Sequence, residues 1–237
     1  MKKHIKKIHE KIEETLVHVI IPSAGIGRRM KSYGCKSLLT INNKKLIDIQ
    51  ISHINNAFPL NEIILVTGFD SDRLMNYSPD DIIKIENEKY YDNNVVKSIS
   101  IGLRATKNND HVLIVFGDIL FNIKSLKEIN LNESSLIISN TMESNEVGCN
   151  INGKNQLEYM MFDLPNKWGH ILYLTSKELS LFKKIILNKK TEKKFCFEII
   201  NEVINQGGKF KCIKHEDIRT MDIDTSKDLQ KAQEFIL

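Results

Sequence analysis

The 237 residues suffice for one α/β domain with its own core, and 41% hydrophobic beside 27% charged residues is ordinary globular composition. The 34 Lys and Arg exceed the 30 Asp and Glu by only four, and much of that excess lies in the first seven residues, so nucleic acid is not an expected partner. No apolar stretch approaches 18 residues and no signal peptide is evident, which predicts a cytoplasmic protein without membrane insertion.

The N-terminal segment, residues 1–16, is predicted to be an amphipathic helix that precedes the domain. Ile5, Ile8, Ile12 and Leu16 recur at three- and four-residue spacings, which gives one apolar stripe. Because such a stripe is unstable in water alone, we expect the helix to contact the domain surface or a second subunit of a homodimer. Contact with an anionic membrane surface is the alternative, which Glu10, Glu13 and Glu14 and the lack of Trp or Phe disfavour. The remaining residues, 17–237, are predicted to form one domain.

The first half of that domain alternates strands and helices. A β-branched strand at 17–22 leads into a small-residue loop at 23–27. Helices follow at about 46–57, 70–76 and 95–106, and strands at 63–67, 82–85 and 112–116. Continuously apolar strands that alternate with helices predict a mostly parallel sheet covered on both faces, with functional loops at the carboxyl ends of its strands.

From about residue 135 the pattern changes. Short strands near 135–140, 147–152 and 157–162 follow one another with no helix between them, which predicts a small antiparallel patch. Helices at 176–188 and 195–206, a strand near 209–213, the acidic run 221–225 and a helix from Ser226 complete the chain. The expected fold is therefore Rossmann-like, with a mixed, mostly parallel sheet, helices on both faces, the antiparallel patch and the N-terminal helix.

The loop after the first strand carries phosphate-binding chemistry. Its glycines in Ala24-Gly25-Ile26-Gly27 let backbone N–H groups approach phosphate oxygens, and Arg28, Arg29 and Lys36 offer compensating positive charge. A Gly-x-Gly also occurs in ordinary tight turns. A P-loop would end in Gly-Lys-Ser/Thr and a dinucleotide fold would carry a third glycine, so these two nucleotide folds are excluded.

Carboxylates occur at two further places in the chain. Asp118 comes directly after the strand at 112–116, where a Mg²⁺ that bridges phosphates is commonly held. Asp222 and Asp224 stand at strand spacing, which places both carboxylates on one face. That face suits a cation, although Asp-x-Asp also occurs in solvated loops and at helix N-caps.

The glycine loop with Lys36, then Asp118, then the pair Asp222 and Asp224 occur in this order along the chain. This arrangement resembles the sugar-phosphate and phosphocholine-type nucleotidyltransferases. The opening motif of that family is Ala-Ala-Gly-x-Gly-x-Arg-Met followed by Pro-Lys-x-Leu. Here the same positions read Ser23-Ala24-Gly25-Ile26-Gly27-Arg28-Arg29-Met30 and Cys35-Lys36-Ser37-Leu38. The similarity continues through 66–69, 93–98, Gly117-Asp118 and 222–229, so it covers most of the chain from residue 17 onward.

The resemblance implies an enzyme that transfers CMP from CTP to a small phosphorylated acceptor, such as phosphocholine or a phosphonate, and releases pyrophosphate. By this likeness Ser23, Ala24, Gly25, Ile26, Gly27, Arg28, Asn93, Asn94, Ser98 and Gly117 bind the nucleotide. Arg29 contacts the β/γ-phosphates and Lys36 stabilises the attacked α-phosphate. Asp118 holds Mg²⁺ with Asp222 or Asp224, and products of such enzymes feed surface polysaccharide, lipid or phosphonate synthesis in bacteria.

The sequence departs from the family pattern at Ser23, Cys35 and Lys45, where the family has Ala, Pro and Pro. None of the charged positions is missing, so we expect activity. Trp168 and His170 are candidate acceptor contacts, and a packed corner is the alternative for Trp168. A sugar-1-phosphate uridylyl- or guanylyltransferase, a molybdenum-cofactor-type nucleotidyltransferase and a nucleotide-binding regulatory module without turnover remain alternative functions.

Overall fold

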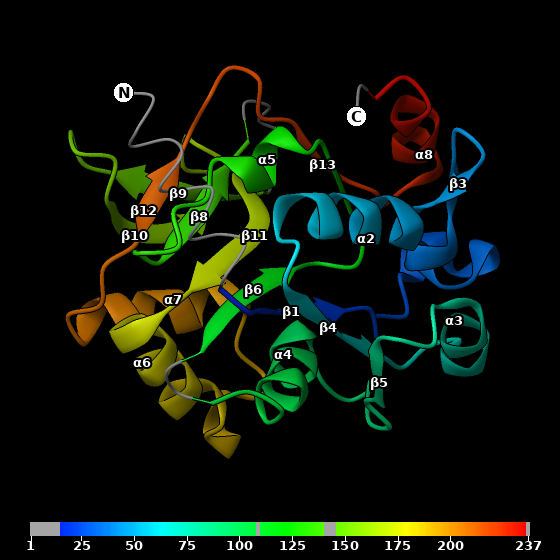
Figure 1. Cartoon of the computed structure of the whole chain (residues 1–237), viewed down its shortest axis with the longest axis horizontal. Helices are drawn as coiled ribbons and strands as arrows, with labels where there is room; N and C mark the ends of the chain where they lie inside the picture. The colour runs from blue at the N-terminus through cyan, green and yellow to red at the C-terminus, as the bar shows by residue number, and fades with distance from the viewer. Residues whose placement is uncertain (1–14, 108–109, 140–145, 236–237) are drawn as a thin grey trace.

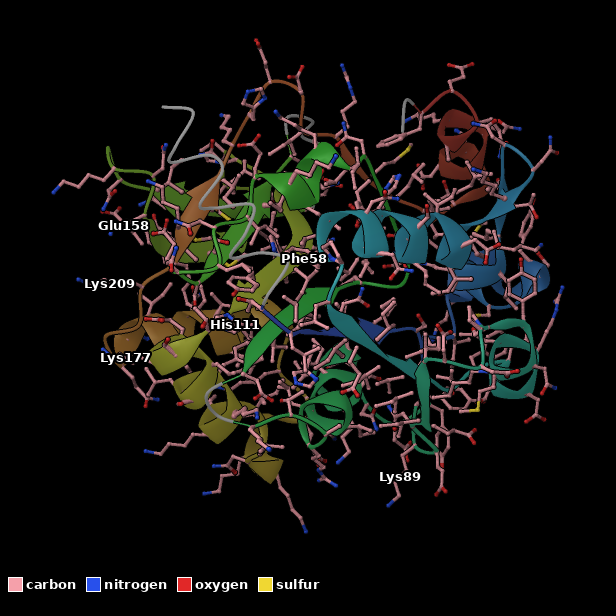
Figure 2. The ribbon with its side chains drawn as sticks, viewed as in Figure 1. Phe58, Lys89, His111, Glu158, Lys177 and Lys209 are labelled. Carbon is pink, nitrogen blue, oxygen red and sulfur yellow. The ribbon has the colours of Figure 1, made fainter. Side chains whose placement is uncertain are left out.

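The computed structural model describes residues 15–107, 110–139 and 146–235. The predicted helix at 1–16 lies almost entirely outside these residues. Charged side chains such as Lys89, Glu158 and Lys177 project from the surface, whereas Phe58 is buried in the interior (Figure 2). In the described part of the chain, no helix combines the length and the apolarity needed to cross a bilayer.

A seven-stranded sheet forms the centre of the domain (Figure 1). Its strands in spatial order are β12 (Lys211–Ile213), β8 (Ser135–Ile138), β11 (Trp168–Leu174), β6 (His111–Val115), β1 (Val17–Pro22), β4 (Asn61–Thr67) and β5 (Ile83–Glu86). Only β11 runs antiparallel to its neighbours; the other adjacent pairs are parallel. The predicted mixed, mostly parallel sheet is therefore confirmed.

Helices cover both faces of this sheet because its strands are apolar on both sides. In β1, Ile20 faces a core shared with α4 (Val95–Leu103), α6 (Ser176–Ile186) and α7 (Cys196–Asn205). Val19 and Ile21 face the opposite core, which contains α2 (Leu46–Ala57), α3 (Ser71–Tyr77) and α5 (Lys124–Lys127). Figure 1 shows α2 and α5 on one side of the sheet and α4, α6 and α7 on the other.

Three short strand pairs lie outside the central sheet. The ribbon of β9 (Val147–Ile151) and β10 (Leu157–Phe162) contains two of the three strands predicted for the antiparallel patch. The third, predicted at 135–140, instead joins the central sheet as β8, because it pairs with β11 and β12. The hairpin of β2 (Thr40–Ile41) and β3 (Lys44–Lys45) precedes α2. The third pair joins β7 (Ile119–Phe121) to β13 (Thr220–Asp222), directly before the last helix, α8 (Ser226–Ala232).

Most predicted elements agree with the structure to within a few residues, but β11 was not predicted. Its seven residues, Trp168–Leu174, form the strand between β8 and β6 in the middle of the sheet. The Trp168-Gly169-His170 sequence resembles a corner, and the backbone does deviate there, since His170 has a φ of 54° and the β8–β11 register shifts between Trp168 and Leu172. The strand thus contains an irregularity that hides its pattern.

Candidate functional site

A cavity of about 430 Å³ lies at the carboxyl ends of β1, β5 and β6, where an α/β sheet is expected to bind its ligand. One wall is the glycine loop, and a second is the segment that leads into α4. The third wall combines carboxylates with the ends of β9, β10 and β11. The residues of these walls include Ser23, Ala24, Gly25, Gly27, Lys36, Asn87, Asn93, Asn94, Ser98, Phe116, Gly117, Asp118, Glu146, Val147, Phe162, His170, Asp222 and Asp224.

The glycine loop is shaped around the Lys36 side chain. Gly27 has a φ of 57°, and a Cβ built on it would lie 3.0 Å from Lys36 Cε. Both the backbone conformation and the close approach therefore require glycine there. The 3-10 helix Lys36–Leu38 presents Lys36 to the cavity.

Ser23 and Gly117 fix the loop against the end of β6. Ser37 Oγ donates to Ser23 Oγ and lies 2.9 Å from the Gly117 carbonyl oxygen, a second acceptor. A Cβ on Gly117 would lie only 2.1 Å from Ser23 Oγ. The Ser that replaces the family's Ala at position 23 thus takes part in a buried hydrogen-bond network that ties the glycine loop to the strand before Asp118.

Lys36 stands between two carboxylates. Its Nζ lies 2.9 Å from Asp118 Oδ2 and 2.5 Å from Asp224 Oδ1, and Arg29 Nη2 lies 2.6 Å from Asp224 Oδ2. Burial alone would lower the pKa of Lys36, but the two carboxylates raise it above its ordinary value. Lys36 therefore keeps its positive charge at the cavity wall, beside acids supplied from distant parts of the chain.

Pairing between β7 and β13 brings these acids together. Asp222 lies opposite Ile119, and the Ile223 N–H donates to the Asp118 carbonyl at 3.0 Å. The Thr225 hydroxyl then caps α8 by accepting from the Asp228 N–H, which ends the extended segment just after Asp224.

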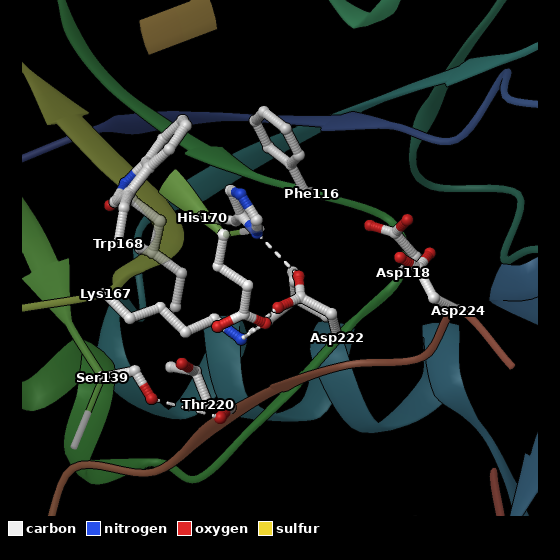
Figure 3. Close-up of polar contacts among 12 residues, drawn as sticks. Phe116, Asp118, Ser139, Lys167, Trp168, His170, Thr220, Asp222 and Asp224 are labelled. Atoms are coloured by element: carbon white, nitrogen blue, oxygen red, sulfur yellow. Dashed lines mark hydrogen bonds and ion pairs between the residues drawn. The ribbon is translucent and has the colours of Figure 1, made fainter. Parts of the chain in front are cut away.

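Asp222 and Asp224 have different partners, so the prediction that they share one face of a strand is wrong. Asp222 contacts Lys167 Nζ at 2.5 Å and His170 Nδ1 at 2.7 Å (Figure 3). Asp224, in contrast, contacts Lys36 Nζ at 2.5 Å. The physical reason is that β13 ends at Asp222, and the chain turns toward α8 before Asp224.

Lys167 and His170 compensate the charge of Asp222. Lys167 is 4% exposed, and its Nζ also lies 2.5 Å from Glu146 Oε1. Burial alone would raise the pKa of Asp222, yet His170 and Lys167 hold it well below its ordinary value. Asp222 is therefore an ionised group within a buried network, at the end of the cavity formed by β9, β10 and β11.

Trp168 does not contact the cavity. Its indole is 2% exposed and its Nε1 donates to the Ile171 carbonyl at 3.3 Å. His170, in contrast, lines the cavity and stacks on Phe116 with ring centroids 5.0 Å apart. The prediction that Trp168 forms an acceptor wall is corrected, because the bulge in β11 turns His170 toward the cavity and leaves Trp168 behind it (Figure 3).

The wall before α4 is built from amides. Asn87 Nδ2 donates to Asn93 Oδ1 at 3.0 Å and to Ser98 Oγ at 3.1 Å, while Asn93 Nδ2 donates to the Lys89 carbonyl at 2.7 Å. Asn94 caps α4 by accepting from the Val96 N–H, and its Nδ2 donates to the Lys194 carbonyl. Asn93 and Asn94 thus hold the wall in place, and Asn87, which is 2% exposed, faces the cavity.

Most residues predicted for the site line the cavity. Four of the predicted residues do not line it: Ile26, Arg28, Arg29 and Trp168. Arg29 nevertheless contacts the cavity-lining residue Asp224. The sequence analysis missed Asn87, Phe116, Glu146, Phe162 and Lys167, which the fold brings to the cavity or to the carboxylates beside it. Asn87 directly follows β5 and Phe116 directly follows β6, and a position at the carboxyl end of a strand is a usable signal.

Comparisons with known proteins agree with this geometry. Residues 19–129 match the family model of the MobA-like NTP transferase domain. No curated protein sequence matches the chain.

Solved structures share the fold at low identity. The CTP:phosphocholine cytidylyltransferase from Streptococcus pneumoniae is 16% identical, with a TM-score of 0.77 over 93% of this chain and 98% of that one. The inositol-1-phosphate CTP transferase from T. maritima is 16% identical, with a TM-score of 0.71 over 94% of this chain and 97% of that one. A UDP-glucose pyrophosphorylase from Acinetobacter baumanii is 12% identical, with a TM-score of 0.71 over 92% of each chain.

Proposed function

We propose that this chain, whose residues 19–129 belong to the nucleotidyltransferase family, transfers CMP from CTP to the phosphate of a small acceptor and releases pyrophosphate. The observation that carries the proposal is the position of Lys36 beside the glycine loop, between Asp118 and Asp224. Positive charge, backbone N–H groups and carboxylates that can hold a metal ion are the three requirements for binding and polarising a triphosphate.

In the proposed reaction, an oxygen of the acceptor phosphate attacks the α-phosphorus of CTP. A new O–P bond forms as the bond between the α-phosphorus and the bridging oxygen breaks, and that oxygen leaves with pyrophosphate. The acceptor phosphate is already anionic, so no general base is needed. The chain contributes positioning by the glycine loop and charge stabilisation by Lys36 and Arg29.

Asp118 and Asp224 are the residues that fit a divalent cation. They already share one ammonium group, and their side chains are 34% and 36% exposed toward solvent. No cluster of three or more His, Cys, Asp or Glu side chains suited to a metal occurs in the described ranges. Mg²⁺ needs only one or two carboxylates when phosphate oxygens complete its shell, so this pair fits it. When bound there, Mg²⁺ would neutralise charge on the triphosphate.

Asp222 is the weaker candidate for the metal, because its side chain is only 19% exposed and it does not contact the Lys36 ammonium group that Asp118 and Asp224 share. His170 and Asp222 are the members of the buried Asp222 network that line the cavity beside β9 and β10, and there we place the acceptor phosphate. We assign His170 to the contact with that phosphate, Asp222 to the orientation of His170, and Lys167 to holding Asp222 in place.

Asn87 supports the choice of cytidine. The Lys89 carbonyl oxygen can only accept a hydrogen bond, so the Asn93 side chain directs its Nδ2 toward it and its Oδ1 toward Asn87. Asn87 must therefore donate to Asn93 from its own Nδ2, which fixes the orientation of the Asn87 amide. No described residue donates to Asn87 Oδ1. A fixed acceptor in the cavity suits the amino group of cytosine and disfavours the carbonyl oxygen at the same position of uracil.

A pyrophosphate-release assay with the four ribonucleoside triphosphates and a panel of phosphorylated acceptors tests this function. We expect CTP to be preferred and Mg²⁺ to be required. Asp118→Asn should lower the rate by at least about a hundredfold, because an amide is a poorer Mg²⁺ ligand than a carboxylate. Preference for UTP or GTP with a sugar 1-phosphate would overturn the cytidylyl assignment, and no release with any pair would overturn nucleotidyl transfer.

A further inference from the structure

Three phenyl rings form a cluster at the mouth of the cavity. Phe162, at the end of β10, lies edge-on to Phe195 and Phe197, with ring centroids 6.0 Å and 5.3 Å away. Phe195 and Phe197 stack on each other at 5.7 Å. Phe162 is 42% exposed and Phe195 is 53% exposed. Large apolar side chains that remain this exposed together commonly mark a binding surface.

This cluster continues the cavity wall. Phe162 pairs with Val147 across the β9–β10 ribbon, and both side chains line the cavity. Phe116, stacked on His170, lies on the same wall beside the Asp222 network. An acceptor whose phosphate lies near His170 would therefore extend its organic part over Val147 and Phe162 toward Phe195.

Among the described residues, the polar side chains along this path are already engaged. Asn94 uses its amide to cap α4 and to hold the Lys194 carbonyl. Glu146 pairs with Lys167, and His170 pairs with Asp222. The hydroxyl groups of a sugar would lose their water here and find few new partners, which disfavours binding. Burial of a hydrocarbon surface at the same place would instead contribute favourable free energy to binding.

We propose that the organic part of the acceptor is rich in hydrocarbon, as opposed to a polyol, and that Phe162, supported by Phe195 and Phe197, is its specificity-determining contact. The inference rests on the proposed function, since it assumes that the acceptor phosphate binds beside His170. A second copy of the chain is the other occupant that such a surface could bind, but Phe162 lies on the cavity wall itself, so the reaction's own substrate must pass it.

The test compares two hydrocarbon-rich acceptors with a polyol. The probes are phosphocholine, its uncharged isostere 3,3-dimethylbutyl phosphate, and glucose 1-phosphate. With CTP present, kcat/KM should be at least about tenfold higher for both hydrocarbon-rich acceptors than for glucose 1-phosphate. Equal use of the first two indicates hydrocarbon contact alone, and preference for phosphocholine adds a cation–π contribution; both support the proposal.

Variants separate the aromatic wall from general effects on the enzyme. Phe162→Ala should lower kcat/KM for 3,3-dimethylbutyl phosphate by about tenfold to a hundredfold, with an unchanged KM for CTP and little change for glucose 1-phosphate. Tyr159→Ala is the matched control, because Tyr159 lies on the same strand and is 44% exposed but does not line the cavity. It should leave all values unchanged.

Three results would overturn the proposal. One is a preference for glucose 1-phosphate in the wild type, and another is an equal loss with every acceptor in Phe162→Ala. The third is that the wild type is a dimer, and that Phe195→Ala dissociates it without changing the acceptor selectivity. That result would assign the aromatic surface to contact with a second copy of the chain. If no acceptor supports turnover, the proposed function fails instead. Calorimetric binding of the same phosphates still tests the inference, with tighter binding of the dimethylbutyl ester expected and equal binding contradicting it.

Discussion

Replacement of Lys167 by Met is expected to destabilise the protein strongly, although Met has nearly the same length. Lys167 is 4% exposed, and its ammonium lies 2.5 Å from both Glu146 Oε1 and Asp222 Oδ2. The substitution leaves two carboxylates facing each other without the cation that separates them. Removal of one partner from a buried ion pair typically costs about 3–5 kcal/mol.

The side chains of Glu146 and Asp222 are 20% and 19% exposed, so water screens part of their repulsion. We therefore expect a loss of about 3 kcal/mol, toward the lower end of that range. For a domain of this size the loss corresponds to a decrease in Tm of about 6–12 °C. Urea unfolding and thermal melts measure the two quantities independently.

Lys124→Met is the matched control. Lys124 pairs with Glu128 on the surface at 2.8 Å, where water screens the pair, so its loss should leave the unfolding free energy almost unchanged. Adding Glu146→Gln to Lys167→Met should restore part of the lost stability, because one of the two facing charges disappears. Equal unfolding free energies for Lys167→Met and Lys124→Met would refute the reasoning.

Two further predictions concern the frame of the site. Gly117→Ala should lower the free energy of unfolding by about 1–3 kcal/mol, because the new Cβ would lie 2.1 Å from Ser23 Oγ. In a Ser23→Ala background the loss measured by urea unfolding should be smaller. An equal loss in both backgrounds would contradict the packing argument. Because the pKa of Asp222 is lowered in the folded state, its contribution to stability is fully present above the unfolded pKa of about 3.9 and is lost as the pH falls further. The stability difference between wild type and Asp222→Asn should therefore shrink below about pH 4, and a difference that stays constant from pH 7 to pH 3 would exclude this linkage.

Local sequence patterns were sufficient for much of the fold. The apolar runs predicted β1, β4, β5 and β6, and helical periodicity predicted α2 over its full length, 46–57. Asp118 and the glycine loop could also be placed at the sheet edge, because each directly follows a strong strand. For these elements a short stretch of chain contains the information that determines the structure.

The rest of the site depends on contacts between residues far apart in the chain. The three-residue pair β7–β13, which brings Asp222 and Asp224 to Asp118, has no local signature. Lys167 was not predicted because a lone lysine usually lies in solvent, and only the fold shows Glu146 and Asp222 beside it. Phe162 likewise belongs to the site only because the end of the β9–β10 ribbon reaches the cavity.

Transfer of the α-phosphoryl group beside Lys36 is the central claim, and isotope labelling tests it most directly. CTP labelled with ³²P at either the α- or the γ-phosphate is incubated with Mg²⁺, phosphocholine and the protein, and the products are separated. We expect the α-label in the acceptor product and the γ-label in pyrophosphate. Lys36→Ala should reduce both by at least about a hundredfold, since one preorganised charge contact at a transition state is worth several kcal/mol. Release of the γ-label as inorganic phosphate, or an unchanged rate in Lys36→Ala, would contradict the account.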